Sequence, residues 1–138
     1  MDNDKIKKVA KQLLDSDLGL TKAQVAGLVG GFILESQLNP KAKNSINAQG
    51  IAQWLGSRRD AYSRLHGKSL LDSSLEDQVN YVIYELKGPE RVALRHLKST
   101  SSVKDAAIFA DKYYERSEGT EKIRSKKWEY AEQVMKLL

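Results

Sequence analysis

The sequence predicts a single, mainly α-helical domain over residues 1–138. Apolar residues recur at helical spacing almost throughout the chain. There is no internal repeat, linker or low-complexity segment, and the length suits one domain that buries roughly two-thirds of its unfolded surface. Hydrophobic residues make up 41% and charged residues 30% of the chain, values that are ordinary for a globular protein.

The first helix is expected to begin near Asn3 or Asp4, since either residue can act as its N-cap, and to end at Gly19. Apolar residues follow these caps at helical spacing, at Ile6, Val9, Ala10, Leu13 and Leu14.

The second helix is expected over residues 22–38, because Thr21 and Gln24 fit a capping box and Asn39-Pro40 follows. It is apolar on most sides, which is typical of a central, buried helix. Its three glycines, Gly27, Gly30 and Gly31, each lower helix propensity by about 1 kcal/mol. Close helix packing or open space for a ligand would explain them.

Residues 41–49 lack helical periodicity and are expected to form a loop or a short β-hairpin. Five more helices are predicted after it. Ser57 is expected to cap the first of them, which runs to about residue 66, and Ser73 or Ser74 the second, which ends at Gly88-Pro89. The others are expected over residues 90–97, over residues 103–114 and, after a loop at 117–119, to the end of the chain.

The composition leaves carboxylates as the main candidates for acid–base chemistry. There is no cysteine, which excludes disulfides, thiolate metal sites and a Cys/His nucleophile. His66 and His96 lack metal-ligand spacing, and no GxSxG motif is present. We therefore expect neither a cofactor nor a metal.

The net charge and the N-terminal sequence indicate which partners and which cellular location to expect. The net charge is +5, and its excess lies toward the C-terminus. This charge fits either a solvated helical face or a surface for polyanions, but no RNA-binding signature accompanies it, so no nucleic-acid partner is expected. No signal peptide and no apolar run long enough to span a bilayer is found, so synthesis in the cytoplasm and no membrane insertion are expected.

Glu35 is the first candidate for chemistry. A carboxylate at the C-terminal end of an apolar helix meets both burial and the negative end of the helix dipole, and both favour its protonated form. A protonated carboxylic acid is what a glycosidase uses to protonate a departing glycosidic oxygen. The alternative is an exposed Glu35 bonded to Lys41 or Lys43.

The residues that follow Glu35 resemble a known signature. Glu35-Ser36 is followed by spaced Ala and Ser residues and by Gly50-Ile51-Ala52-Gln53. This segment is similar to soluble lytic transglycosylases and goose-type lysozymes. The ending Gln53-Trp54, followed by Arg58-Arg59, resembles the phage tail lysozyme family more closely. The signature favours Gly where this chain has Asn47, a residue that tolerates a left-handed backbone less easily.

The resemblance implies a lysozyme-like α+β fold, with two helical lobes and the hairpin or loop flanking an active-site cleft. It also implies cleavage of the MurNAc–GlcNAc β-1,4 bond of peptidoglycan. By motif, Glu35 matches the catalytic acid and Ser36 supports it at the helix end. The resemblance further implies a substrate-binding group, in which Tyr114 matches the transglycosylase tyrosine: Ser36, Ser45, Gln53, Trp54 and Tyr114.

Independent reasons support two of these residues. Gln53 offers a donor and an acceptor to sugar hydroxyl or N-acetyl groups. Trp54 supplies either an apolar face for a pyranose ring or a core aromatic anchor, and both readings stay open.

A second carboxylate is not evident, because no Asp or Glu lies between Glu35 and Asp60. Glu35 either acts alone, with the MurNAc 6-hydroxyl closing a 1,6-anhydro product, or shares the work with a water-positioning acid. The candidates for that acid are Asp60, Glu85 and Glu115, each of which is otherwise structural. Hydrolysis and lytic transglycosylation both stay open.

The sequence therefore predicts a monomeric, phage-type muramidase that acts at the cell wall, as an endolysin or as a virion-associated enzyme beside phage tail proteins. The alternative is a non-catalytic structural or cell-wall-binding module with the same fold. A further hypothesis assigns binding of anionic wall polymers to four basic residues of the last helix: Lys122, Arg124, Lys126 and Lys127.

Overall fold

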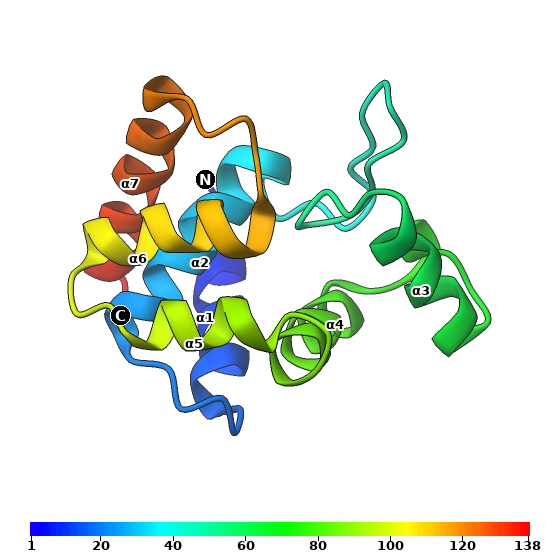
Figure 1. Cartoon of the computed structure of the whole chain (residues 1–138), viewed down its shortest axis with the longest axis horizontal. Coiled ribbons are helices and arrows are strands. Elements are labelled where there is room, and N and C mark those ends of the chain that lie inside the picture. The colour runs from blue at the N-terminus through cyan, green and yellow to red at the C-terminus, as the bar shows by residue number, and fades with distance from the viewer.

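The computed structural model describes residues 1–138 and is mainly helical, as expected. The chain forms seven α-helices, one 3₁₀ turn and one π-helix (Figure 1). In chain order they are α1 (Asn3–Asp15), α2 (Lys22–Ser36), α3 (Ser57–His66), η1 (Leu70–Asp72), α4 (Leu75–Lys87), α5 (Arg91–Lys98), α6 (Val103–Phe109), η2 (Ala110–Glu115) and α7 (Glu121–Lys136). No helix combines the length and the apolar character needed to cross a bilayer.

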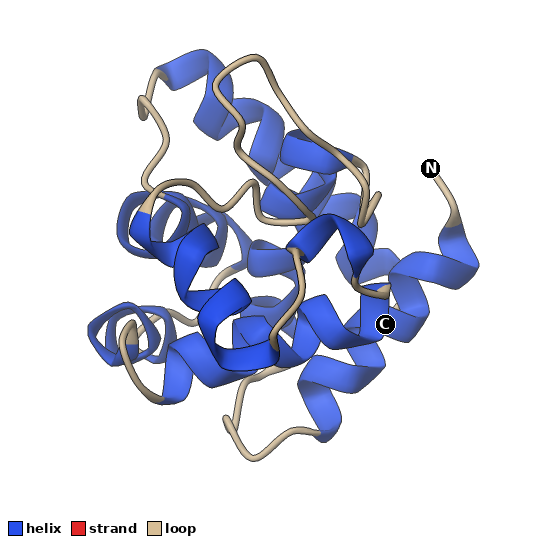
Figure 2. Cartoon of the chain, turned by 90° about the vertical axis from the view of Figure 1, so that its right-hand side faces the viewer, coloured by secondary structure: helices blue, strands red, loops and turns tan.

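The β-hairpin is not formed, so the loop alternative describes residues 37–56. No strand is present (Figure 2), and only two isolated antiparallel bridges, Lys43 with Gln49 and Gln49 with Trp54, occur in this segment. The α+β part of the expected fold is therefore not seen. In Figure 1 this loop and α3 form one side of the molecule, and α2, α6 and α7 lie on the other.

Helix α2 lies at the centre of the fold, and its glycines allow other helices to approach it closely. A Cβ atom at Gly27 would lie 2.6 Å from the backbone of Ala106 in α6, and one at Gly30 would lie 2.6 Å from the Ala131 nitrogen in α7. Neither atom fits without moving a backbone. Of the two explanations for these glycines, close helix packing applies to this pair.

The predicted caps are partly right. The capping box of Thr21 and Gln24 is present, and Ser74 Oγ accepts a hydrogen bond from Asp77 N, 3.0 Å away, at the start of α4. The first cap is one residue earlier than expected, because Asp2 rather than Asn3 or Asp4 accepts from Lys5 N. Ser57 does not cap α3: Gly56 precedes the helix and makes no side-chain cap bond.

Two buried polar side chains fasten the loop to the helices. Ser36 Oγ donates to the carbonyl oxygens of Phe32 and Ile51, at 3.0 and 2.7 Å. Gln78 of α4 accepts from Ile51 N and donates to Pro40 O and Leu70 O. Each bond leaves a buried polar group satisfied. The loop after Glu35 is thus held from both sides.

The last expected helix before α7 changes its form at Ala110. Residues 103–109 are α-helical, and residues 110–115 form a π-helix in which Arg116 N donates to Asp111 O, five residues back. Such wide turns are rare and often lie at functional sites. Here the π-helix turns Asp111, Tyr114 and the Glu115 side chain toward the interior.

Candidate functional site

Glu35 lies in the last turn of α2, and its side chain is 27% exposed. Its Oε1 atom is 3.0 Å from Nζ of Lys127, which comes from α7. The alternative of an exposed Glu35 bonded to Lys41 or Lys43 is wrong, because the Lys41 ammonium instead donates to Leu71 O and Lys127 is the paired cation.

Lys127 is fully buried and contacts three carboxylates. Its Nζ donates to Asp111 Oδ1 at 2.6 Å and lies 3.4 Å from Glu115 Oε1, in addition to Glu35. Arg124 Nε donates to the other oxygen of Asp111 at 3.1 Å. We call these five residues, Glu35, Asp111, Glu115, Arg124 and Lys127, the Lys127 cluster. Only Glu35 and Arg124 in it are appreciably exposed.

Glu115 is the unusual member of the cluster. Its side chain is 2% exposed, and neither of its oxygens has a hydrogen-bond partner, so its contact with Lys127 is an ion pair without hydrogen-bond geometry. Burial raises the pKa of Glu115 to about 8, and the charges of Glu35 and Asp111 add to this, although Lys127 opposes it. Near neutral pH Glu115 is therefore mostly protonated.

The other charges of the cluster are stabilised by their partners. Burial alone would raise the pKa of Asp111, but the hydrogen bond from Lys127 and the attraction to it hold that pKa below its usual value. Burial would lower the pKa of Lys127, yet the surrounding carboxylates raise it.

Gly31 provides the space for the Glu115 carboxyl group. A Cβ atom at Gly31 would overlap Glu115 Oε1. Gly31 lies one turn before Glu35 on α2, so the same helix carries the candidate acid and the bare backbone against which Glu115 packs. This third glycine accommodates a side chain of the chain itself, which the sequence did not indicate.

The buried position of Lys127 corrects the hypothesis that four basic residues of α7 face anionic polymers. Lys127 is 0% exposed, and Arg124 is partly buried against Asp111. The reason is the packing of α7 on α2. Lys127, Ala131 and Val134 recur at helical spacing and form the buried face of α7. That spacing was a signal in the sequence that Lys127 lies inside.

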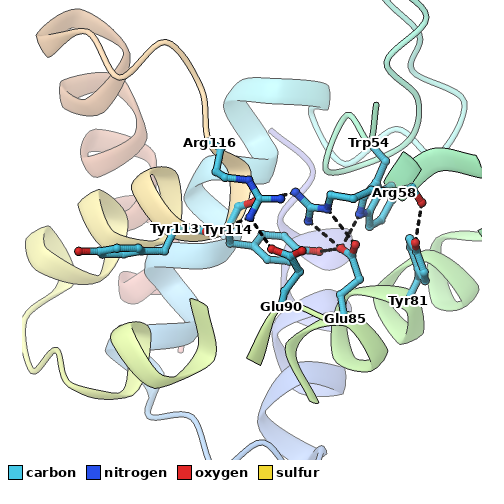
Figure 3. Close-up of polar contacts among 8 residues, drawn as sticks. All are labelled: Trp54, Arg58, Tyr81, Glu85, Glu90, Tyr113, Tyr114 and Arg116. Atoms are coloured by element: carbon cyan, nitrogen blue, oxygen red, sulfur yellow. Dashed lines mark hydrogen bonds and ion pairs between the residues drawn. The ribbon is translucent and has the colours of Figure 1, made fainter. Parts of the chain in front are cut away.

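A second buried cluster surrounds Glu85 of α4 (Figure 3). Glu85 accepts four hydrogen bonds of 2.7–2.8 Å: one from Trp54 Nε1, two from the Arg58 guanidinium, and one from the Tyr114 hydroxyl. Arg58 also donates to Tyr114 O and lies over the Tyr114 ring. We call Trp54, Arg58, Glu85 and Tyr114 the Glu85 cluster. It joins the loop, α3, α4 and the π-helix.

This second cluster accounts for three residues that the sequence placed in the site. Trp54 and Tyr114 are each 1% exposed, so neither ring presents a face to a ligand. Of the two readings of Trp54, a core anchor fits this position. Glu85 is 2% exposed and its acceptor positions are occupied. Burial, and then the charge of Glu85, raises the pKa of Tyr114 well above its usual value.

The remaining predicted residues lie around the loop. Ser36 is buried and bonded to backbone, while Ser45 is exposed. Gln53 is half-buried and donates to Ala42 O and Gly50 O, with a φ of 53°. Asp60 is exposed and pairs with Arg59. Asn47 adopts the left-handed backbone, with a φ of 66°, at the position where the signature favours Gly.

The carboxylates around Glu35 do not form a metal site. No group of three His, Cys, Asp or Glu side chains is arranged to hold a metal ion. A groove of about 480 Å³ lies between α3 and α4, with Tyr62, Tyr81 and Tyr84 in its wall, and Glu35 does not line it. The cleft that the resemblance implies beside Glu35 stays a prediction.

Comparison with known proteins gives one match. A family model described as phage tail lysozyme matches residues 4–138, which is nearly the whole chain. No curated protein and no solved structure matches it.

Proposed function

This chain belongs to the phage tail lysozyme family, and we propose that it cleaves the MurNAc–GlcNAc β-1,4 bond of peptidoglycan with Glu35 as general acid and base. The observation that carries the proposal is the position of Glu35. It is the one carboxylate of the Lys127 cluster that is appreciably exposed, whereas Asp111 and Glu115 are closed off. Of these three carboxyl groups, Glu35 is the one that a sugar can approach.

The proposed reaction needs one proton donor and one nucleophile. Glu35 gives its proton to the glycosidic oxygen while the bond from that oxygen to C1 of MurNAc breaks, and the bonding electrons leave with the oxygen. An oxygen nucleophile then bonds to C1 and returns its proton to the Glu35 carboxylate. This nucleophile is a water molecule in hydrolysis and the MurNAc 6-hydroxyl in transglycosylation.

Glu85 and Glu115 are poorly suited to position a water for this step. The Glu85 carboxylate is enclosed by its four donors. Glu115 is buried, and the ammonium of Lys127 contacts both Glu35 and Glu115, in the region where a water between the two carboxyls would stand. Asp60 is the remaining candidate, but its exposed carboxylate is already paired with Arg59. We therefore favour Glu35 as a lone acid–base residue.

The first test is digestion of purified peptidoglycan by the wild type, Glu35→Gln and Glu129→Gln. Glu129 is 62% exposed on α7 and makes an exposed ion pair, so its variant is a matched control. We expect soluble muropeptides from the wild type and the control, and a rate lower by about 10²–10⁴-fold in Glu35→Gln. Equal turnover by all three would contradict the role of Glu35.

Absence of turnover in all three would instead favour a non-catalytic, wall-binding module. Mass spectrometry of the released fragments distinguishes the two reactions, because hydrolysis leaves reducing MurNAc ends and transglycosylation leaves 1,6-anhydro ends.

The place of action is a separate part of the proposal. The family description names phage tails, and we propose that this chain is carried on the virion and opens the wall during DNA entry, rather than being released freely as an endolysin. Detection of the chain in purified virions by mass spectrometry would support this role. Its presence only in the lysate would favour the endolysin.

A further inference from the structure

The cation beside Glu35 is a buried lysine that contacts three carboxyl groups. The Lys127 ammonium has no exposed surface, and its strongest contact is the 2.6 Å hydrogen bond to Asp111, which Arg124 holds in turn from the other side. The glycine contact of Gly30 with Ala131 fixes α7 against α2 one turn beyond Lys127. The position of Nζ relative to Glu35 is therefore set by packing and by the π-helix.

The Lys127 side of the ion pair with Glu35 is shielded from solvent. An exposed ion pair is screened and contributes little, whereas a buried cation acts through a low dielectric. Four groups beside Glu35 carry charge or can titrate: Lys127 and Arg124 from α7, and Asp111 and Glu115 from the π-helix. Lys127 is the one of these that contacts Glu35.

We propose that Lys127 is a positioning residue for Glu35: its ammonium, held by Asp111, fixes the carboxyl group at the end of α2 and stabilises the negative charge that develops as Glu35 gives up its proton. The inference rests on the function proposed above. A fixed positive charge placed where negative charge develops lowers a reaction barrier, since it needs no rearrangement at the moment of reaction.

Lys127 and Asp111 should affect the Glu35 carboxyl group in opposite directions. A purely structural role of these residues would not produce opposite effects. Removal of the cation, in Lys127→Met, should make Glu35 hold its proton to higher pH. Removal of the carboxylate that competes for the same ammonium, in Asp111→Asn, should act in the opposite direction. Lys126→Met is the matched control, because Lys126 is 52% exposed and pairs with Glu129 only.

The primary measurement is a titration of the Glu35 Cδ resonance by carbon-13 NMR in each protein, with the fold checked by circular dichroism. We expect the midpoint to be higher than in the wild type in Lys127→Met, lower in Asp111→Asn, and unchanged in Lys126→Met. An unchanged midpoint in folded Lys127→Met would overturn the inference. If Lys127→Met does not fold, an unchanged midpoint in Asp111→Asn overturns it.

The second measurement is the pH profile of muropeptide release. In Lys127→Met we expect kcat to fall by about tenfold to a hundredfold, KM to change little, and the alkaline limb of the profile to move to higher pH. Lys127→Arg, which keeps the charge, should recover part of kcat. A wild-type protein that releases nothing would contradict the proposed function, while the NMR titration would still decide whether Lys127 controls Glu35.

Discussion

The Glu85 cluster and the Lys127 cluster both bury charges against the π-helix, but they differ in how these charges are satisfied. Each oxygen of Glu85 receives hydrogen bonds, and one guanidinium balances one carboxylate. In the Lys127 cluster three carboxyl groups and two cations meet, and Glu115 has no hydrogen-bond partner. Buried polar groups are normally paired, so the unpaired Glu115 sets the Lys127 cluster apart from the Glu85 cluster. The comparison separates a structural cluster from a candidate chemical one.

The largest effect on stability is expected from breaking the satisfied cluster. Glu85→Ala would leave the Arg58 guanidinium partly buried without its carboxylate, and would remove the acceptor of Trp54 and Tyr114. We expect a loss of about 3–5 kcal/mol in the free energy of unfolding, measured by urea denaturation. Asp60→Asn, at an exposed pair, should change it by less than about 0.5 kcal/mol. Similar losses in both variants would contradict the structural role of Glu85.

The next effect depends on pH and belongs to Glu115. Its pKa of about 8 in the folded chain lies above its ordinary value of 4.5, so the folded chain binds more protons than the unfolded chain between these values. This contribution to stability is complete below about pH 4.5 and is lost as the pH rises through about 8, by roughly 5 kcal/mol.

Glu115→Gln should remove this slope, because its amide stays neutral. The measurement is the free energy of unfolding from pH 4 to 9 in both proteins, with exposed Glu118→Gln as control. Parallel curves for the wild type and Glu115→Gln would show that Glu115 does not titrate in this range.

The smallest effect concerns the space beside Glu115. Gly31→Ala would place a methyl group on the Glu115 carboxyl group, and the resulting overpacking should cost about 1–3 kcal/mol despite the better helix propensity of Ala. In Gly31→Ala with Glu115→Ala the added methyl group has room. In urea denaturation, the double variant should therefore lose less free energy of unfolding than the two single variants lose in sum. Full additivity would show that the two residues do not compete for the same space.

The sequence predicted the helices well because their signals are local. The spacing of apolar residues and the pairing of Thr21 with Gln24 depend on neighbours within one or two turns. The π-helix was not predicted, since the pattern of residues 103–114 fits a continuous α-helix equally well. The same limit left residues 41–49 open between a loop and a short β-hairpin, and a loop fastened by Gln78 is what forms.

The candidate site was predicted in part. The motif around Glu35 singled out one carboxylate, but its partner Lys127 lies near the other end of the chain, and no local pattern pairs the two. The basic composition of α7 suggested an exposed surface, although the spacing of Lys127 with Ala131 and Val134 marked a buried face. Tyr114 was placed beside the ligand by its motif, and Trp54 was left open between a sugar platform and a core anchor, because the sequence alone does not distinguish a buried aromatic residue from one in an active site.

The π-helix limits where residues can be inserted into or deleted from this chain. A turn that closes over five residues instead of four holds one residue more than an α-helix would. Tyr114 on this turn belongs to the Glu85 cluster, and Asp111 and Glu115 belong to the Lys127 cluster. A one-residue deletion there would rotate the residues that follow by about 100° relative to α6. Insertions and deletions should therefore be selected against between residues 110 and 115.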